Sequence, residues 1–208
     1  MENTEHQLTD SVFSHLEGTC RYCSEESAAQ IRQAISALPL RSVHWIGTGD
    51  YHYLSLFWAE RIGEPFVLIL FDNHPDDQDA AFGGGLLSCG GWVRQVRALP
   101  FCKGVVWFDG KGRVHGDLKA SAELPAYLSV DLDVLDVAYA RTNWDQGSVS
   151  LGALLGAIGS ITAERRIIGA DICGGLAESE CASCDLERNG ATVREISALI
   201  SKALVQAA

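Results

Sequence analysis

Residues 67–76 read VLILFDNHPD, and the rest of the sequence is best interpreted outward from them. The five apolar residues from Val67 to Phe71 predict a short buried strand that runs directly into Asp72. In an extended backbone, alternate residues point to the same side, so Asp72, His74 and Asp76 would converge beyond the end of the strand. Buried carboxylates are strongly penalised unless a cation meets them. We therefore predict a divalent metal site at the carboxyl end of a parallel sheet.

The surrounding sequence alternates predicted strands with predicted helices. Apolar runs predict strands over residues 41–46, 66–71, 104–108, 127–131 and 166–171, and apolar residues at helical spacing predict helices over 24–38, 51–62, 89–99, 151–161 and 192–205. This alternation is typical of an α/β fold with a mainly parallel sheet, whose sites lie beyond the carboxyl ends of the strands. The sequence contains no internal repeat or linker, so we expect residues 1–208 to form a single domain.

Composition excludes several classes of function. The formal net charge is −11, from 16 basic and 27 acidic residues, and no cluster of Lys and Arg suits a phosphate backbone, so we expect no nucleic-acid partner. The one short basic pair, Arg165-Arg166, is interpreted as a solvated edge at the start of a strand. No run approaches the roughly 20 apolar residues of a membrane span. The polar start MENTEHQLTD is unlike a secretory signal, and we expect a cytoplasmic protein that acts on a small molecule.

The seven cysteines are an odd number in a chain without a predicted export signal, which favours free, reduced thiols. Cys20 and Cys23 have C-x-x-C spacing, and so do Cys181 and Cys184. Together the pairs could form a four-thiolate zinc site, although they lie far apart and no histidine flanks either pair. Chance spacing or redox-sensitive thiols are the simpler interpretation.

Two further stretches complete the candidate site. Ser129-Val130-Asp131-Leu132-Asp133 places Asp131 and Asp133 two residues apart at the end of another predicted strand. His52 lies at the turn that opens a helix. The candidate ligands are then two imidazoles and four carboxylates: His52, Asp72, His74, Asp76, Asp131 and Asp133.

This ligand set predicts two metal ions. Six ligands are more than one tetrahedral ion uses, and mixed carboxylate and imidazole ligation suits Mn²⁺ better than zinc. Two such cations about 4 Å apart would share one hydroxide as a nucleophile at neutral pH. Taken alone, the D-x-H-x-D motif could instead be a loop that caps helices, and Asp133 or Asp136 could cap a helix. Acidic groups at three separate strand ends weaken that simpler interpretation.

Three motifs in this order resemble those of the ureohydrolase superfamily, which comprises arginase, agmatinase, formimidoglutamase and related enzymes. The motifs are IGTGDYHYLS, FDNHPD and SVDLDVLD, and the resemblance covers roughly residues 41–175. It implies a three-layer α/β/α arginase-like fold and a binuclear manganese centre on the six residues above, with two Mn²⁺ per chain. It also implies hydroxide attack on a guanidinium or amidine carbon, and family members commonly form homo-oligomers.

The sequence departs from the family pattern at several positions. Tyr51 separates Asp50 from His52, where the family has Asp directly before His. Cys89 stands where family members typically carry a histidine that shuttles protons, and a thiol of depressed pKa could exchange protons there; a small buried residue at a helix start is the alternative. The family's Asp-x-x-Glu, whose glutamate pairs with the guanidinium, reads here Asp171-Ile172-Cys173-Gly174.

These observations predict a binuclear manganese hydrolase of linear amidine or guanidino C–N bonds. Asp133 or Cys89 would manage protons, and Trp144, Asp145 and Glu178 are candidates for substrate contacts, although turn formation explains Asp145 nearly as well. The missing glutamate and histidine motivate an alternative, which is a metal-binding protein without ureohydrolase turnover, such as a sensor or a regulatory partner. A deacetylase on the same metals is disfavoured because the paired-histidine motif of such enzymes is absent.

Overall fold

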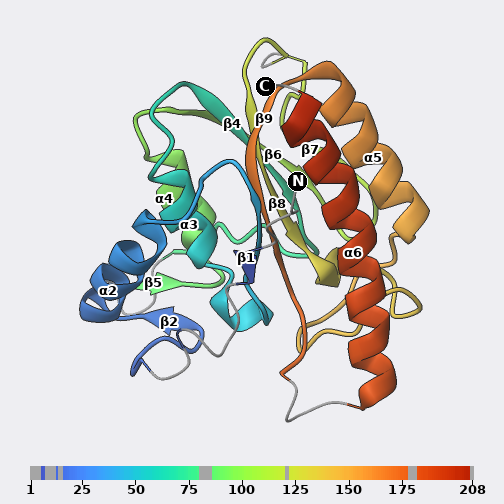
Figure 1. Ribbon diagram of the computed structural model, residues 1–208, viewed down its shortest axis with the longest axis horizontal. Helices are drawn as coiled ribbons and strands as arrows, with labels where there is room; N and C mark the ends of the chain where they lie inside the picture. Colours follow the sequence, from blue (N-terminus) through green and yellow to red (C-terminus); the bar gives the residue numbers. More distant parts are fainter. Residues whose placement is uncertain are drawn as a thin grey trace.

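The computed structural model of this chain describes residues 6–7, 13, 16–79, 86–119, 122–177 and 182–206. A seven-stranded sheet runs through the molecule, with helices on both of its faces (Figure 1). Its strand order is β1 (His6–Gln7), β3 (Val43–Trp45), β9 (Ile167–Cys173), β8 (Ala126–Asp131), β4 (Phe66–Phe71), β6 (Cys102–Phe108) and β7 (Val114–His115). Every neighbouring pair is parallel except β6 and β7. A separate antiparallel pair is formed by β2 (Tyr22–Cys23) and β5 (Leu87–Ser88).

The helices form two layers. On one face of the sheet lie α2 (Glu25–Ser36), α3 (Leu54–Ala59) and α4 (Trp92–Arg97), and on the other lie α5 (Leu151–Glu164) and α6 (Ser183–Gln206) (Figure 1). Helix α2 begins where the Ser24 hydroxyl accepts a hydrogen bond from the Ser27 N–H, and α5 begins where Ser150 caps Ala153 in the same way. The three-layer α/β/α architecture with a mainly parallel sheet is therefore confirmed.

Burial on both faces explains why the central strands read as unbroken apolar runs. Along β4, Phe66, Leu68 and Leu70 belong to the core beneath α2, α3 and α4. Val67 and Ile69 belong to the core beneath α5 and α6. Covering both faces removes the polar alternation that a half-exposed strand would show. The same packing directs the carboxyl ends of β4, β8 and β9 to one edge of the sheet.

Several element boundaries differ from the sequence prediction. The sequence predicts one continuous helix over residues 51–62. The structure instead has a 3₁₀ turn, η1 (Gly49–Tyr51), followed by the short helix α3. Helix α4 begins at Trp92 and not near Cys89, because the backbone at Cys89 still pairs with Arg21 next to β5. The C-terminal helix begins at Ser183 rather than at Thr192.

Tertiary contacts account for the longer C-terminal helix. Its first half contains the polar stretch 185–190, which lacks apolar periodicity. The buried Asn189 side chain accepts a hydrogen bond from the Arg141 N–H and donates one to the Arg141 carbonyl, both at 2.7 Å. Thr192 also donates to the Tyr139 carbonyl at 2.6 Å. These hydrogen bonds attach the polar turns of α6 to the loop after β8. Local sequence patterns do not predict such distant contacts.

The interpretation of Arg165-Arg166 as a solvated edge is wrong for one residue. Arg165 is only 8% exposed, and it donates to the Leu118 carbonyl at 2.8 Å. Arg166 is exposed and pairs with Glu64. Among the described helices, none has both the length and the apolar character needed to cross a bilayer.

Candidate metal centre

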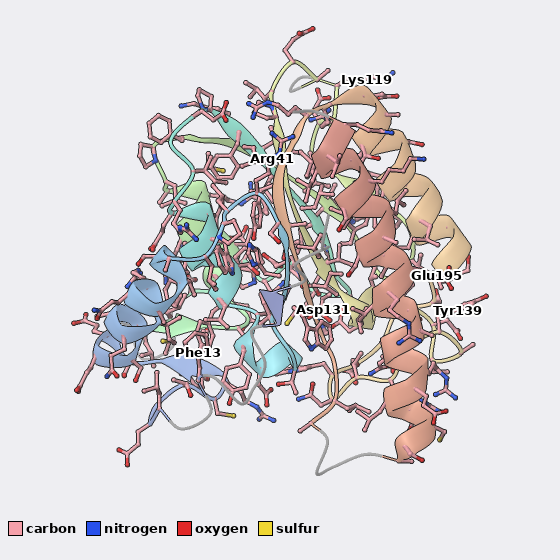
Figure 2. All side chains as sticks on the ribbon, viewed as in Figure 1. Phe13, Arg41, Lys119, Asp131, Tyr139 and Glu195 are labelled. Carbon is pink, nitrogen blue, oxygen red and sulfur yellow. The ribbon has the colours of Figure 1, made fainter. Side chains whose placement is uncertain are left out.

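The candidate metal ligands gather at the carboxyl edge of the central strands. Asp72 follows β4, Asp131 ends β8, and His52 follows η1 in the connection between β3 and α3. In Figure 2, Asp131 lies at the lower end of the sheet, between the two helical layers. Strand β8 pairs directly with β4 and with β9, so three adjacent strand ends converge there.

The two aspartate motifs converge through turns rather than through strand alternation. β4 ends at Phe71, and the Asp72 Oδ1 then accepts a hydrogen bond from the His74 N–H at 2.6 Å. Asp76 has a left-handed backbone with φ +46°. The Asp131 Oδ1 accepts from the Asp133 N–H at 2.9 Å at the start of η3 (Leu132–Val134). The expectation that an extended backbone aligns Asp72, His74 and Asp76 was therefore wrong in its geometry, although the side chains do meet.

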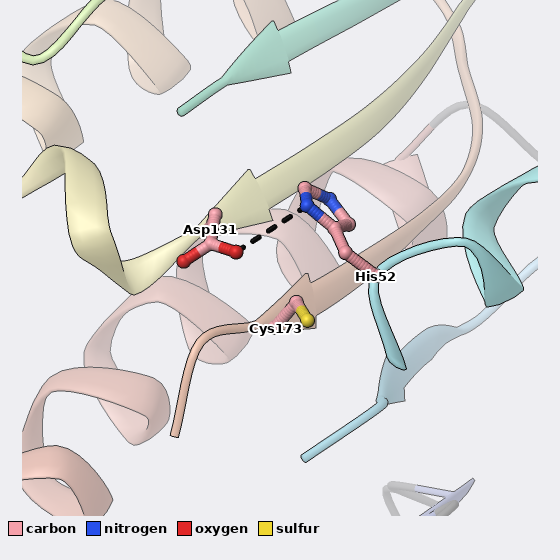
Figure 3. Close-up of side chains that lie close together, drawn as sticks. All are labelled: His52, Asp131 and Cys173. Atoms are coloured by element: carbon pink, nitrogen blue, oxygen red, sulfur yellow. Dashed lines mark ion pairs between the residues drawn. The ribbon is translucent and has the colours of Figure 1, made fainter. Parts of the chain in front are cut away.

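His52 lies at the centre of one group of carboxylates. Its Nδ1 lies 3.2 Å from Asp72 Oδ2, 3.1 Å from Asp76 Oδ2 and 3.3 Å from Asp131 Oδ2. Figure 3 shows the imidazole directed at the Asp131 carboxylate, with Cys173 on the neighbouring strand. His52 is 2% exposed, so its imidazole is almost completely shielded from solvent. The intervening Tyr51 does not turn His52 away from the aspartates.

His74 belongs to a second group that shares Asp72 with the first. Its Nδ1 lies 2.8 Å from Asp133 Oδ2 and 3.6 Å from Asp72 Oδ1. Within the described residues, three sets of donor atoms lie close enough together to hold an ion: His52, Asp72 and Asp76; Asp72, His74 and Asp133; and His52, Asp131 and Cys173. Asp72 therefore lies between two neighbouring positions for a cation.

A second layer of hydrogen bonds orients these ligands. The His52 Nε2 lies 2.9 Å from the Ser129 Oγ, and Ser129 donates to the buried Asp171 at 2.7 Å. The Trp92 indole N–H donates to Asp76 Oδ2 at 2.7 Å. Such partners fix the orientation of a metal ligand.

The electrostatics show how strongly the carboxylates attract positive charge. Burial opposes protonation of His52, but the close carboxylates of Asp72 and Asp76 outweigh it and hold the His52 pKa well above its usual value. A hydrogen bond to Asp133, supported by one to Asp72, raises the pKa of His74 to about 11. Burial and the charge of Asp72 raise the pKa of Asp133 to about 6. Each imidazole would thus carry a proton in a position that a metal ion would otherwise occupy.

The donor set fits a pair of divalent cations. The Asp72 Oδ2 is fully buried and has no hydrogen-bond partner among the described residues, which leaves it available for an ion. Four carboxylates balance the charge of two divalent cations. Carboxylate and imidazole donors suit manganese and related first-row ions. The thiol of Cys173, which sequence reasoning did not place in the site, adds a softer donor beside His52 and Asp131.

A cavity of about 270 Å³ opens onto the ligands. Its lining comprises Arg21, Tyr22, Gly49, His52, Asp72, His74, Asp76, Gln78, Ser88, Cys89, Gly90, Asp131, Asp133 and Trp144. The predicted residues Cys89 and Trp144 thus face the cavity. Asp145 is not among the lining residues; its carbonyl accepts a hydrogen bond from the Asn73 side chain at 2.9 Å. Glu178 lies outside the described residues.

Cys89 has the electrostatics of a neutral thiol. Burial, together with the nearby Asp76 carboxylate, raises the pKa of Cys89 to about 12. A thiolate at neutral pH would require the opposite shift. The cysteine that stands where the family carries a histidine is therefore a poor acceptor of protons in this environment.

Gly174 leaves no room for the glutamate that the ureohydrolase motif has at this position. Its φ is +88°, and a Cβ at this position would lie 2.0 Å from the Asp131 Oδ1 and 2.8 Å from the Leu132 nitrogen. The backbone nitrogen cannot move aside without moving η3. The backbone conformation at Gly174 and its contacts with Asp131 and Leu132 therefore exclude a glutamate at this position.

The loop that carries Trp144 is held by direct backbone contact. Gly147 donates to the Asp133 carbonyl and Ser148 to the Gly110 carbonyl, both at 2.7 Å. A Cβ at Gly147 would lie 2.5 Å from the Gly110 Cα. The two backbone segments therefore lie too close together for any residue other than glycine. Trp144 itself donates its indole N–H to Asp50 Oδ1 at 3.1 Å.

Sequence reasoning missed Arg21 and Gln78 in the cavity wall. Arg21 lies inside the Cys20-x-x-Cys23 spacing, 31 residues before His52, and that spacing does not indicate a place beside the metal ligands. Its place in the site depends on a contact with Asp50, which no periodicity indicates. Gln78 follows the D-x-H-x-D motif and is held by a hydrogen bond from its N–H to the Gly90 carbonyl.

The three-layer fold of this chain is arginase-like. Among solved structures, proclavaminate amidino hydrolase from Streptomyces clavuligerus is similar, with a TM-score of 0.67, 18% identity and coverage of 89% of this chain and 72% of that chain. A hypothetical agmatinase from Burkholderia thailandensis has a TM-score of 0.62 and 19% identity over 88% of this chain and 67% of its own. Arginase from Medicago truncatula has a TM-score of 0.59 and 16% identity over 87% and 65%, respectively. The expected ureohydrolase resemblance is thereby confirmed at the level of the fold.

Sequence comparison identifies a nearer relative. An uncharacterised protein of Thermotoga maritima is 37% identical over 181 residues, which cover 80% of this chain and 71% of the relative. The chain belongs to the same family as that protein. No family model matches the sequence.

Proposed function

We propose that this protein is a hydrolase of linear amidine or guanidino C–N bonds that works with two Mn²⁺ ions. The observation that carries the proposal is the sharing of Asp72 between two groups of donors, one around His52 and one around His74 and Asp133. The fold shared with amidino hydrolases, agmatinases and arginases supports the choice of substrate class. Two cations held there would supply a water activated for attack at neutral pH.

The residues of this chain contribute orientation and proton handling. Asp133 is the proposed proton acceptor, because its carboxylate lines the cavity beside the donor groups, where it could take a proton from a bound water. His74 Nδ1 lies 2.8 Å from Asp133 Oδ2, and the two side chains would hold one cation together with Asp72. Cys89 would line the cavity as a neutral thiol and could donate a weak hydrogen bond. It would not act as a base, because its raised pKa keeps the thiol protonated at neutral pH. Trp144 and the cavity wall would exclude water from the substrate.

Metal content and turnover test the proposal together. The purified protein is stripped with chelator, reloaded with Mn²⁺ and assayed for metal by mass spectrometry and for urea or ammonia release from a panel of guanidino and amidine compounds. We expect about two ions per chain and turnover on at least one compound. The variant Asp131→Asn should lose metal, whereas Asp79→Asn, at an exposed carboxylate outside the cavity, should retain it. Fewer than one ion per chain after loading would refute the proposal.

A second candidate is a metal-binding protein without ureohydrolase turnover. The observation that favours it is Gly174, whose surroundings exclude the glutamate that pairs with a guanidinium in the family motif. Full metal content with no turnover on the whole panel would select this candidate. Cytoplasmic location and assembly into a homo-oligomer stay predictions from the sequence.

A further inference from the structure

Arg21 enters the cavity wall from an unusual backbone conformation. Its φ is +63°, in the left-handed region that residues other than glycine rarely adopt. The Arg21 N–H donates to the Asp50 carbonyl at 3.0 Å, and the Arg21 carbonyl accepts from the Cys89 N–H at 2.9 Å. The residue is thus fastened on one side to the turn that carries His52 and on the other to Cys89. Strained residues held by their surroundings in this way cluster at functional sites.

The side chain of Arg21 is oriented by two neighbours. Its Nε donates to Asp50 Oδ1 at 3.2 Å, the same oxygen that accepts from Trp144. The guanidinium carbon lies 5.4 Å from the centre of the Trp144 ring, close enough for a cation–π contact. Within the described residues, all hydrogen bonds of this side chain go through Nε, so the edge formed by Nη1 and Nη2 remains available. The side chain is 58% exposed.

The charges around the cavity favour an anionic ligand group. Arg21 is the one lysine or arginine among the described lining residues. The lining carboxylates are Asp72, Asp76, Asp131 and Asp133, and all four belong to the donor groups around His52 and His74. Once these carboxylates hold cations, the charges left beside the cavity are the Arg21 guanidinium and the Asp50 carboxylate, which accepts a hydrogen bond from the Arg21 Nε and leaves the Nη1 and Nη2 edge to a ligand. The site of the family's glutamate is closed by Gly174.

We propose that Arg21 is a specificity-determining residue that binds a carboxylate of the substrate, so that the substrate is a small guanidino or amidino acid rather than a cationic amine. The inference rests on the proposed function for the reacting end of the molecule. The free edge of a guanidinium matches a carboxylate with two parallel hydrogen bonds. The same positive charge repels an ammonium tail.

Binding to the manganese-loaded protein tests this inference with three probes that differ only in their tails. They are 4-guanidinobutanoate, its neutral counterpart 4-guanidinobutanamide, and agmatine, which has a cationic tail. Calorimetry should give a dissociation constant for the acid about tenfold below that of the amide, as one charge-assisted pair implies, and weakest binding for agmatine. The preference should shrink as salt rises, because a partly exposed pair is screened.

Variants assign the preference to the residue. Arg21→Gln should bind acid and amide equally, and Arg21→Lys should keep part of the preference through its charge. Arg166→Gln, at an exposed arginine paired with Glu64 outside the cavity, should behave as the wild type. Equal binding of acid and amide by the wild type would overturn the inference, and so would an acid preference that survives in Arg21→Gln.

Turnover measured in parallel separates the two proposals. An acid preference that depends on Arg21, without hydrolysis of these probes or of any compound in the guanidino and amidine panel, would support the role of Arg21 and refute the proposed activity. Hydrolysis of the amide or agmatine without preference for the acid would do the reverse. The salt dependence of wild-type binding requires no variant: an acid preference that does not shrink as salt rises would contradict the inference even if Arg21→Gln does not fold.

Discussion

A methyl group added at Gly174 probes the closest contact in the candidate metal centre. In Gly174→Ala, the new Cβ would lie 2.0 Å from the Asp131 Oδ1 and 2.8 Å from the Leu132 nitrogen. The left-handed backbone at φ +88° costs a residue with a Cβ about 1–2 kcal/mol. Relieving the overlap adds about 1–3 kcal/mol, as is usual when a packed region is overfilled. We therefore expect a loss of about 3 kcal/mol in the free energy of unfolding.

The same substitution should weaken metal binding, because Asp131 must turn away from His52 to make room. A tenfold loss of affinity reduces the stabilisation that saturating Mn²⁺ provides by about 1.4 kcal/mol. Urea unfolding with and without Mn²⁺ measures both effects, and mass spectrometry measures the bound metal. Gly156→Ala is the matched control: it lies in α5, a Cβ there meets nothing within 4 Å, and it should stabilise the protein by about 0.5–1 kcal/mol.

The result that would refute this reasoning is simple to recognise. If Gly174→Ala unfolds at the wild-type urea concentration and binds the wild-type amount of metal, then Asp131 is not confined by the Gly174 backbone. A glutamate could in that case be introduced at position 174 as well.

Two further substitutions test hydrogen bonds to carboxylates. Trp92→Phe removes the indole N–H that donates to Asp76, and we expect Mn²⁺ affinity to fall about tenfold in a metal titration. Asp109→Asn should destabilise the protein by about 2 kcal/mol at pH 7, because the buried carboxylate accepts bonds from Arg113 and His115. Burial opposes ionisation of Asp109, but these bonds outweigh it and lower its pKa below the usual 3.8. The difference between wild type and Asp109→Asn should therefore persist above pH 3.8 and shrink as the pH falls through the lowered pKa.

Each of these expectations has a control or a contradicting outcome. Trp58→Phe makes the same change of size at an indole whose N–H has no hydrogen-bond partner among the described residues, so Mn²⁺ affinity should stay at the wild-type value. Equal loss of affinity in both tryptophan variants would attribute the effect to packing. For Asp109→Asn, urea unfolding at pH 7 and pH 4 should show a clear deficit, and a deficit that grows on acidification would contradict the sign of the pKa shift.

The spacing of residues predicted which side chains meet but not how the backbone brings them together. Asp72, His74 and Asp76 were placed on one side of an extended strand, whereas a turn closed by the Asp72 carboxylate gathers them. Spacing of two residues suits both geometries. The central strands were predictable because burial on both faces leaves an unbroken apolar run, as Val67 to Phe71 shows.

Features that depend on distant contacts could not be predicted from local patterns. The first half of α6 is polar, and it is helical because Asn189 bonds to the Arg141 backbone 48 residues away. Arg21 joins the cavity through Asp50, 29 residues further along the chain. The sequence shows that position 174 is a glycine where the ureohydrolase motif has a glutamate. Only the structure shows that the Asp131 Oδ1 occupies the space that a side chain there would need.

The contact between Gly110 and Gly147 limits how the cavity could adapt to other substrates. Because two backbone segments are in contact there, the wall that carries Trp144 cannot move outward. A bulkier ligand would gain room only if Trp144 were substituted by a smaller residue. Another side of the cavity is lined by Tyr22 and Ser88 of the short β2–β5 pair and by Cys89, which follows β5; these side chains differ in size and could be exchanged without moving the central sheet. Diversification of ligand preference among relatives should therefore concentrate on that side.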